Sequence, residues 1–157
     1  YSNEYNESNS IEKFSNGTPH ILSLSTLKTS LDITIEATTE ELNIKSDKLF
    51  DYFVSIYIGK LKKLNFELLT PMDMSNRGSH IAISHKEAWR ISKCLINPID
   101  NDKLSIIIDF RPNNIIRIAL TPLYTSFEDI YLISKRLINI VNEEEYRQKD
   151  YSMEGVT

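Results

Sequence analysis

The sequence predicts a two-layer α+β domain, in which a β-β-α-β-β-α unit follows two helices. Short strands are indicated by the alternating segment SHIAIS at residues 79–84 and by the apolar segment LSIIIDF at residues 104–110. Helices are indicated by apolar residues spaced three or four positions apart. Four short strands with two helices on one face bury a single core, and antiparallel pairing leaves the other face open to water or to a partner.

Composition limits the classes of protein to consider. The 157 residues are enough for a real core, and 41% hydrophobic with 25% charged residues is an ordinary globular mixture. A net charge of −4 and scattered basic residues argue against a nucleic-acid partner. No apolar stretch reaches the roughly 18 residues of a membrane span, and the polar start does not resemble a signal peptide.

The single cysteine, Cys94, lies in a helical apolar run, so we expect a buried thiol rather than a nucleophile. A chain without an intrachain disulfide fits a reducing compartment, and we expect a cytoplasmic protein. Because the chain starts with Tyr1 and not with methionine, we also expect it to be a piece of something longer or a processed product.

The first predicted helix runs from Pro19 to Glu36, after a polar lead-in over residues 1–16. Thr18 is a good N-cap, and proline suits the first helical position. Unpaired N–H groups at a helix start attract phosphate or carboxylate, and Gly17 would allow a ligand to approach the backbone. On spacing alone, however, a Thr-Pro start is usually only a cap.

The second predicted helix runs from Thr39 to Leu64 after the capping box Thr38–Glu41. This helix is long for an isolated small domain and could bridge two parts of a larger protein. The segment FELL at residues 66–69 then starts the first strand.

The middle of the chain predicts a strand at 79–84 and a helix opened by a capping box at Ser84–Glu87. His80 falls on the polar face of the strand. We expect it to be solvated rather than a metal ligand, since no second His or Cys lies at ligand spacing. The sequence therefore predicts no metal site.

The third strand is predicted from Lys103 to Phe110, and the fourth from Ile115 to Leu120 runs antiparallel to it. Between them Asp109 and Arg111 could form an exposed pair worth about 0–1 kcal/mol. The last helix is predicted to start at Thr125, with Glu128 three residues on, and residues 146–157 to form a frayed polar tail.

Arg117 is a charge inside an apolar strand. Because side chains alternate along a strand, it shares a face with Ile115 and Ala119. Such a charge lies either on the solvent-exposed face of a sheet or in contact with an anion, and spacing alone favours the solvent-exposed face.

Three strings in this order resemble the C-terminal part of kynureninase, a fold-type-I pyridoxal-phosphate enzyme of the aspartate-aminotransferase-like superfamily. They are FSNGTPHILSLSTLKTSLDI, LLTPMDMSNRGSHIAISH and IIIDFRPNNIIRIALTPLYTSFEDI. The similarity covers about Ile11 to Ile140, and the last string is the most specific.

The resemblance implies hydrolysis of L-kynurenine or 3-hydroxykynurenine to L-alanine and anthranilate or its hydroxy derivative, in tryptophan catabolism and NAD biosynthesis. The cofactor would be pyridoxal 5'-phosphate, which acts as the electron sink. It also implies a homodimer with a cross-subunit site. Residues 1–37 would end the large cofactor domain, 38–64 would form a connecting helix, 65–145 the small C-terminal domain and 146–157 a tail.

Two sites carry over from the resemblance. Arg117 matches the arginine that grips the α-carboxylate of the substrate, and Gly17 with Thr18 matches a segment that reaches the neighbouring subunit's cofactor phosphate and substrate. The lysine that binds the cofactor is missing from this chain, so we expect no catalytic residue here and no activity from the chain alone. The resemblance assigns no role to Arg77, Asp109, Arg111 or Tyr124.

Two alternatives stay open at the level of the sequence. One is another enzyme of the same fold, such as a desulfurase-like lyase, which would keep the carboxylate-binding arginine. The other is a non-catalytic interaction module. The sequence does not decide between kynurenine and its 3-hydroxy derivative, nor does it give the oligomeric state of the isolated piece.

Overall fold

A computed structural model describes residue 4 and residues 6–148 of the chain. It has the predicted β-β-α-β-β-α order after two helices, so the predicted fold class is confirmed. In chain order the elements are η1 (Ile11–Phe14), α1 (Ile21–Ala37), α2 (Thr39–Gly59), η2 (Leu61–Leu64), β1 (Glu67–Leu68), η3 (Met74–Asn76), β2 (His80–Ser84), α3 (Ala88–Ile96), β3 (Asp109–Arg111), β4 (Ile115–Ala119), α4 (Phe127–Asn142) and η4 (Glu145–Arg147).

The chain forms two compact units, one that ends at Glu36 and one that begins at Ala37. Each is described here by itself. The first unit holds η1 and α1, and no residue of α1 is buried. The assignment of the chain to a large domain, a connecting helix and a small domain stays a prediction.

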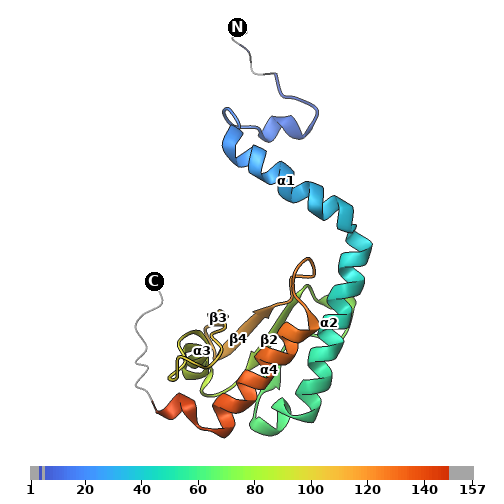
Figure 1. The fold of residues 1–157 in the computed structure, drawn as a ribbon. Helices are drawn as coiled ribbons and strands as arrows, with labels where there is room; N and C mark the ends of the chain where they lie inside the picture. The colour runs from blue at the N-terminus through green and yellow to red at the C-terminus, as the bar shows by residue number, and fades with distance from the viewer. Residues whose placement is uncertain (1–3, 5, 149–157) are drawn as a thin grey trace. The chain divides into compact units, whose positions relative to one another are not determined.

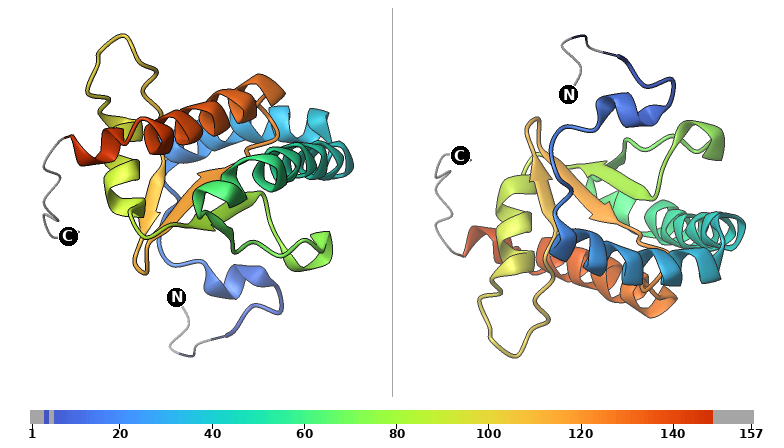
Figure 2. Two further views of the ribbon diagram at one scale, coloured as in Figure 1. Left: turned by 90° about the horizontal axis from the view of Figure 1, so that it is seen from below. Right: turned by 90° about the horizontal axis from the view of Figure 1, so that it is seen from above.

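The second unit is built on one antiparallel sheet with the strand order β1-β2-β4-β3 (Figures 1 and 2). Helices α2, α3 and α4 supply the other layer, and their buried side chains share one core with the sheet. The residues of this core that are less than 2% exposed and have the largest side chains are Phe50, Phe53, Leu49, Leu61, Ile81, Ile83, Ile91, Leu95, Ile116, Leu120, Ile130 and Leu137. Because helices cover one face of the sheet, buried and more exposed side chains alternate along β2 and β4.

The alternation predicted for β2 is confirmed, since Ile81 and Ile83 are buried whereas His80 is exposed. In β4, Ile116 and Ile118 point into the same core, which places Arg117 on the opposite face. The face that carries Arg117 is the one that the core does not use.

Three of the four predicted helix starts are displaced by one to several residues. Helix α1 begins at Ile21, not at Pro19, and the Thr18 cap is wrong. Instead, the carbonyl of His20 accepts the N–H of Leu24 at 3.0 Å, and its ring Nδ1 accepts the N–H of Ser23 at 3.3 Å.

The other two N-caps also differ from the prediction. Ser126, not Thr125, caps α4, because the Asp129 carboxylate accepts the backbone N–H of Ser126 at 2.7 Å and completes a capping box. Helix α3 follows Glu87, so the predicted capping box at Ser84 is wrong. The Thr38 cap of α2 is confirmed by its bond from the N–H of Glu41 at 3.3 Å.

Two predicted elements are shorter in the structure. Helix α2 ends at Gly59, and a 3₁₀ turn replaces the rest of the predicted helix up to Leu64. The predicted third strand pairs with β4 only over Asp109–Arg111. The preceding residues are held elsewhere, because the N–H of Ile106 donates to the carbonyl of Leu95 at 2.7 Å and the Ser105 hydroxyl donates to the carbonyl of Ile96.

The predicted tail starts inside the fold. Tyr146 is 5% exposed and joins the core, and Glu145 next to it is 1% exposed. Residues 149–157 of that predicted tail lie outside the described residues. Across the described residues, the structure contains no helix that is both long enough and apolar enough to cross a membrane.

Candidate functional site

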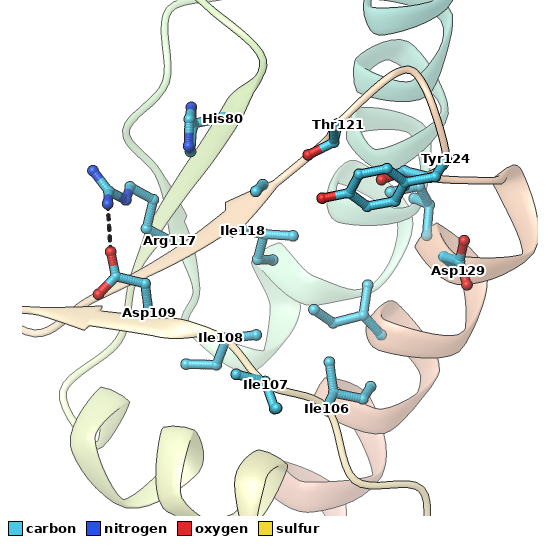
Figure 3. A pocket seen from close by; sticks show the side chains of 14 residues that line it. His80, Ile106, Ile107, Ile108, Asp109, Arg117, Ile118, Thr121, Tyr124 and Asp129 are labelled. Carbon is cyan, nitrogen blue, oxygen red and sulfur yellow. Dashed lines mark ion pairs between the residues drawn. The ribbon is translucent and has the colours of Figure 1, made fainter. Parts of the chain in front are cut away.

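Arg117 lies in the middle of the sheet, between two neighbours set by the strand register. Its Cα partner on β2 is Ala82, and its Cα partner on β3 is Asp109. The Arg117 Nη2 lies 2.5 Å from the Asp109 Oδ2 (Figure 3). The two side chains are 39% and 41% exposed, so this ion pair is accessible from the face of the sheet opposite the helices.

The Asp109 carboxylate binds a second arginine. The Nε of Arg111 donates to the same Oδ2 at 2.8 Å, as the sequence predicted. Two guanidinium groups therefore share one carboxylate, and the cluster keeps a net charge of +1.

The pairing of Asp109 with Arg117 was not predicted. It follows from the hairpin register, in which Arg111 faces Ile115 and Asp109 faces Arg117. The signal lies in the connection, because Asn113 and Asn114 both have left-handed backbone angles, which Asn adopts more readily than most residues. Recognition of that short loop would have given the register.

A cavity of about 450 Å³ opens beside the Arg117 cluster. It forms where β3 stops at Asp109, so that Ile107 and its neighbours do not pair with β4. Figure 3 shows Arg117, Asp109 and His80 at one end and Tyr124 and Asp129 at the other. Its apolar lining consists of Ile106, Ile107, Ile108, Ile118, Ala119, Ile130 and Ile133. A cavity with an apolar wall and a cation at one end suits a ligand that is itself amphipathic.

The far end of the cavity is shaped by the turn that follows β4. The carbonyl of Thr121 accepts the N–H groups of Tyr124 at 3.2 Å and of Thr125 at 2.9 Å, and the Tyr124 side chain is 77% exposed. The pKa of the Asp129 carboxyl is lowered by the N–H and the hydroxyl of Ser126. Asp129 is thus committed to the start of α4, which leaves Arg117 as the charged group best placed for a ligand.

His80 lies on β2 next to the Arg117 side chain, in agreement with the predicted position on the polar face (Figure 3). Within residue 4 and residues 6–148, no three His, Cys, Asp or Glu side chains are grouped closely enough to hold a metal ion.

Gly17 and Thr18 belong to the first unit, whereas Arg117 belongs to the second. Gly17 has a φ of +80°, a conformation that strains other residues, and a Cβ added there would meet no atom within 4 Å. Thr18 is exposed and does not cap α1. Its hydroxyl and the neighbouring N–H groups are donors that suit a phosphate oxygen, so the donor set fits the predicted cofactor phosphate.

Arg77, which the sequence left without a role, has a structural one. Its guanidinium lies 2.9 Å from Asp47 and 3.8 Å from the centre of the Phe50 ring, and its side chain is 6% exposed. Arg77 therefore fastens the loop before β2 to helix α2.

Comparison with known proteins places these features in a family. The chain matches the family model described as "Kynureninase C-terminal domain" over residues 42–137. It is 39% identical over 132 residues to a kynureninase of Geobacillus thermodenitrificans, which covers 84% of this chain and 29% of the relative. It is 35% identical over 140 residues to a kynureninase of Bacillus cereus, with coverage of 89% and 31%.

A kynureninase of Shouchella clausii gives a similar result, with 37% identity over 135 residues and coverage of 86% of this chain and 30% of the relative. The chain thus spans less than a third of the length of the relatives it matches.

Proposed function

The chain belongs to the kynureninase family and corresponds to the C-terminal portion of such an enzyme. We propose that it supplies the residue that binds the substrate carboxylate in a pyridoxal-phosphate-dependent kynureninase. The complete enzyme would hydrolyse L-kynurenine or 3-hydroxykynurenine to L-alanine and anthranilate or 3-hydroxyanthranilate. The observation that carries the proposal is Arg117, a half-exposed guanidinium on the open face of the sheet beside an apolar cavity.

The role of Arg117 follows from its chemistry. A guanidinium presents five N–H donors in a fixed plane and can bind a carboxylate through two parallel bonds, which lysine cannot do. Held on a strand, the group would fix one end of an amino-acid substrate. The apolar wall formed by Ile106, Ile118 and Ile130 would then receive an uncharged part of the same molecule.

The cofactor site would be completed by Gly17 and Thr18 from the neighbouring subunit of a homodimer. Pyridoxal phosphate supplies the electron sink that allows the bond between Cβ and Cγ of the substrate to break. Thr18 would donate its hydroxyl to a phosphate oxygen, and Gly17 would keep the backbone in the left-handed conformation that exposes the neighbouring N–H groups. We place this enzyme in the cytoplasm, in the breakdown of tryptophan.

The test replaces Arg117 in a complete kynureninase that has this chain as its C-terminal portion. Arg117→Ala should lower kcat/KM for kynurenine by roughly 30- to 150-fold, the equivalent of about 2–3 kcal/mol for lost bonds to a charged group. Arg117→Lys should recover only part of the loss. The matched control is Arg147→Ala, which removes another half-exposed arginine from an ion pair with Glu144. Normal turnover by Arg117→Ala would show that Arg117 does not bind the carboxylate.

A substrate comparison separates the proposal from another enzyme of the same fold. The complete protein should release anthranilate or its hydroxy derivative from a kynurenine and should not release sulfur from cysteine. The opposite pattern would assign the chain to a desulfurase-like lyase, even though Arg117 would have the same role there.

A further inference from the structure

We propose that Asp109 is a positioning residue for Arg117, which holds the guanidinium in one orientation so that its remaining donors face a ligand carboxylate. This inference rests on the proposed function and adds a residue to it. Three features of the structure carry it, namely the strand register, the small side chains on the other flank of Arg117 and the charge of the cluster.

The strand register places Asp109 where it can hold Arg117. The two residues are Cα partners in an antiparallel pair, so their side chains lie on the same face of the sheet at the closest cross-strand distance. A carboxylate on a single methylene has few rotamers, and its position is set by the backbone of β3. The ion pair between Oδ2 and Nη2, at 2.5 Å, therefore holds the long side chain of Arg117 near its charged end.

The other flank of Arg117 carries two alanines and the exposed side chain of His80. Its partner on β2 is Ala82, and the next residue on the same face of β4 is Ala119. Among the described residues, Asp109 is the ion-pair partner of Arg117, and it contacts the guanidinium at Nη2. A guanidinium held through Nη2 alone keeps enough donors for a contact of two bonds with a second carboxylate.

Arg111 makes this arrangement compatible with an anionic ligand. An aspartate beside a carboxylate-binding arginine would normally repel the ligand. Here Arg111 binds the same Oδ2 at 2.8 Å, so the three side chains together remain positive. Asp109 can thus orient Arg117 without cancelling its attraction for a carboxylate.

A purely stabilising role does not account for the cluster. Its three side chains are 39%, 41% and 53% exposed, and ion pairs with this exposure contribute little to stability. The benefit of Asp109 should therefore appear in ligand binding, as ordering of the Arg117 side chain before the ligand arrives.

The test is Asp109→Asn in the same complete enzyme, because asparagine keeps the size and removes the charge. Ordering one flexible side chain is worth about 0.5–1.5 kcal/mol, so KM for kynurenine should rise about two- to twelvefold with a smaller change in kcat. An analogue of the substrate that lacks the α-carboxylate should bind the variant and the parent equally. Asp109→Glu, which restores a carboxylate, should recover part of the loss.

Controls separate positioning from stability and from simple repulsion. Glu144→Gln removes a carboxylate from an exposed pair with Arg147, and its small effect on thermal unfolding should match that of Asp109→Asn. A larger loss of stability in Asp109→Asn would make the residue structural. A lower KM would show that Asp109 competes with the ligand for Arg117, and an unchanged KM would show that Asp109 does not affect binding. Either result would overturn the proposal.

A double replacement distinguishes failure of this inference from failure of the proposed function. In an Arg117→Ala background, Asp109→Asn should have no further effect on KM. If the second replacement still raises KM, Asp109 acts through another group. If Arg117→Ala alone is fully active, the carboxylate assignment itself is wrong, whatever Asp109 does.

Discussion

Replacing Glu145 with glutamine should destabilise the second unit by about 3–5 kcal/mol, the usual cost of removing one partner from a buried ion pair. The Glu145 side chain is 1% exposed and that of Arg136 is 6% exposed. Arg136 binds both carboxylate oxygens at 2.7 Å, and the backbone N–H of Ile99 adds a third bond at 3.3 Å. Glutamine would leave the Arg136 charge buried without its counter-charge.

The pKa of Glu145 gives a second measure of the same interaction. The hydrogen bonds from Arg136, helped by one from Lys103, lower the pKa of the Glu145 carboxyl from 4.5 to about 2 despite its burial. A difference of that size between folded and unfolded chains corresponds to about 3 kcal/mol. The loss of stability expected from the buried ion pair, about 3–5 kcal/mol, thus agrees with the value that corresponds to the lowered pKa.

The sign of the pH dependence follows from that lowered pKa. Between pH 4.5 and pH 2 the unfolded chain binds a proton at Glu145 that the folded chain does not, so stability falls as the pH falls. The contribution is fully present above pH 4.5 and disappears as the pH drops towards 2. Glu145→Gln should therefore lose this part of the acid sensitivity, and its deficit should shrink as the pH is lowered.

Urea unfolding of the 157-residue chain at pH 7 and at several values down to pH 3 measures both effects. The matched control is Glu144→Gln, since Glu144 is the neighbouring residue and forms an exposed pair with Arg147 at 2.8 Å. The control should change stability by less than about 1 kcal/mol. If Glu145→Gln were as stable as this control at pH 7, the reasoning from burial and pKa would be refuted.

Two further predictions concern single side chains of the same unit. Burial lowers the pKa of His85, whose Nδ1 accepts the N–H of Glu87 at 3.0 Å, so the parent should lose stability as the pH falls below 6.5. His85→Asn should show a smaller loss of unfolding free energy between pH 7.5 and pH 5.5, and equal losses would contradict the assignment. Arg77→Lys should cost about 1–2 kcal/mol, because lysine loses the planar contact with Phe50, and an unchanged midpoint in urea would show that this contact is not stabilising.

The elements that could be predicted from the sequence are those with a strong local pattern. Strand β2 alternates in the sequence and in the structure, and the apolar spacing of α4 matches its buried face. The cap of α4 was misplaced by one residue, since Thr125 and Ser126 are both good caps. The choice depends on Asp129, which reaches back to Ser126 and not to Thr125.

The shortened third strand shows what local pattern could not reveal. The pattern of LSIIIDF predicts a strand over the whole segment. In the structure, however, the N–H of Ile106 donates to the carbonyl of Leu95 in α3. That bond joins residues eleven positions apart and depends on how α3 packs. The cavity beside Arg117 is lined by Ile106, Ile107 and Ile108, which do not pair with β4, so it could not be predicted from local pattern either.

The residues of the candidate site differ in how far the sequence points to them. Arg117 could be singled out because a charge in an apolar strand requires an explanation, whereas its partner Asp109 required the hairpin register. Glu145 was missed for a related reason. The segment NEEEYRQ resembles a solvated helix end, and nothing in its spacing shows that one of three consecutive glutamates turns inward to Arg136.

The cluster around Glu145 illustrates how charges serve stability. Lys103 lies 2.7 Å from Glu143 and 3.1 Å from Glu145, while Arg136 binds Glu145 from inside the core. Two cations and two anions balance, and the central carboxylate is almost inaccessible. Such a cluster has no charge left for a ligand.

The cluster around Arg117 differs in both respects. It has two cations and one anion, it is about half exposed, and it lies on the sheet face that the core does not use. Because exposed pairs stabilise a fold little, the unbalanced charge is available for binding, and a carboxylate is the group that a planar guanidinium recognises best. Charge balance and exposure together thus assign Arg136 to the fold and support the proposed ligand-binding role of Arg117.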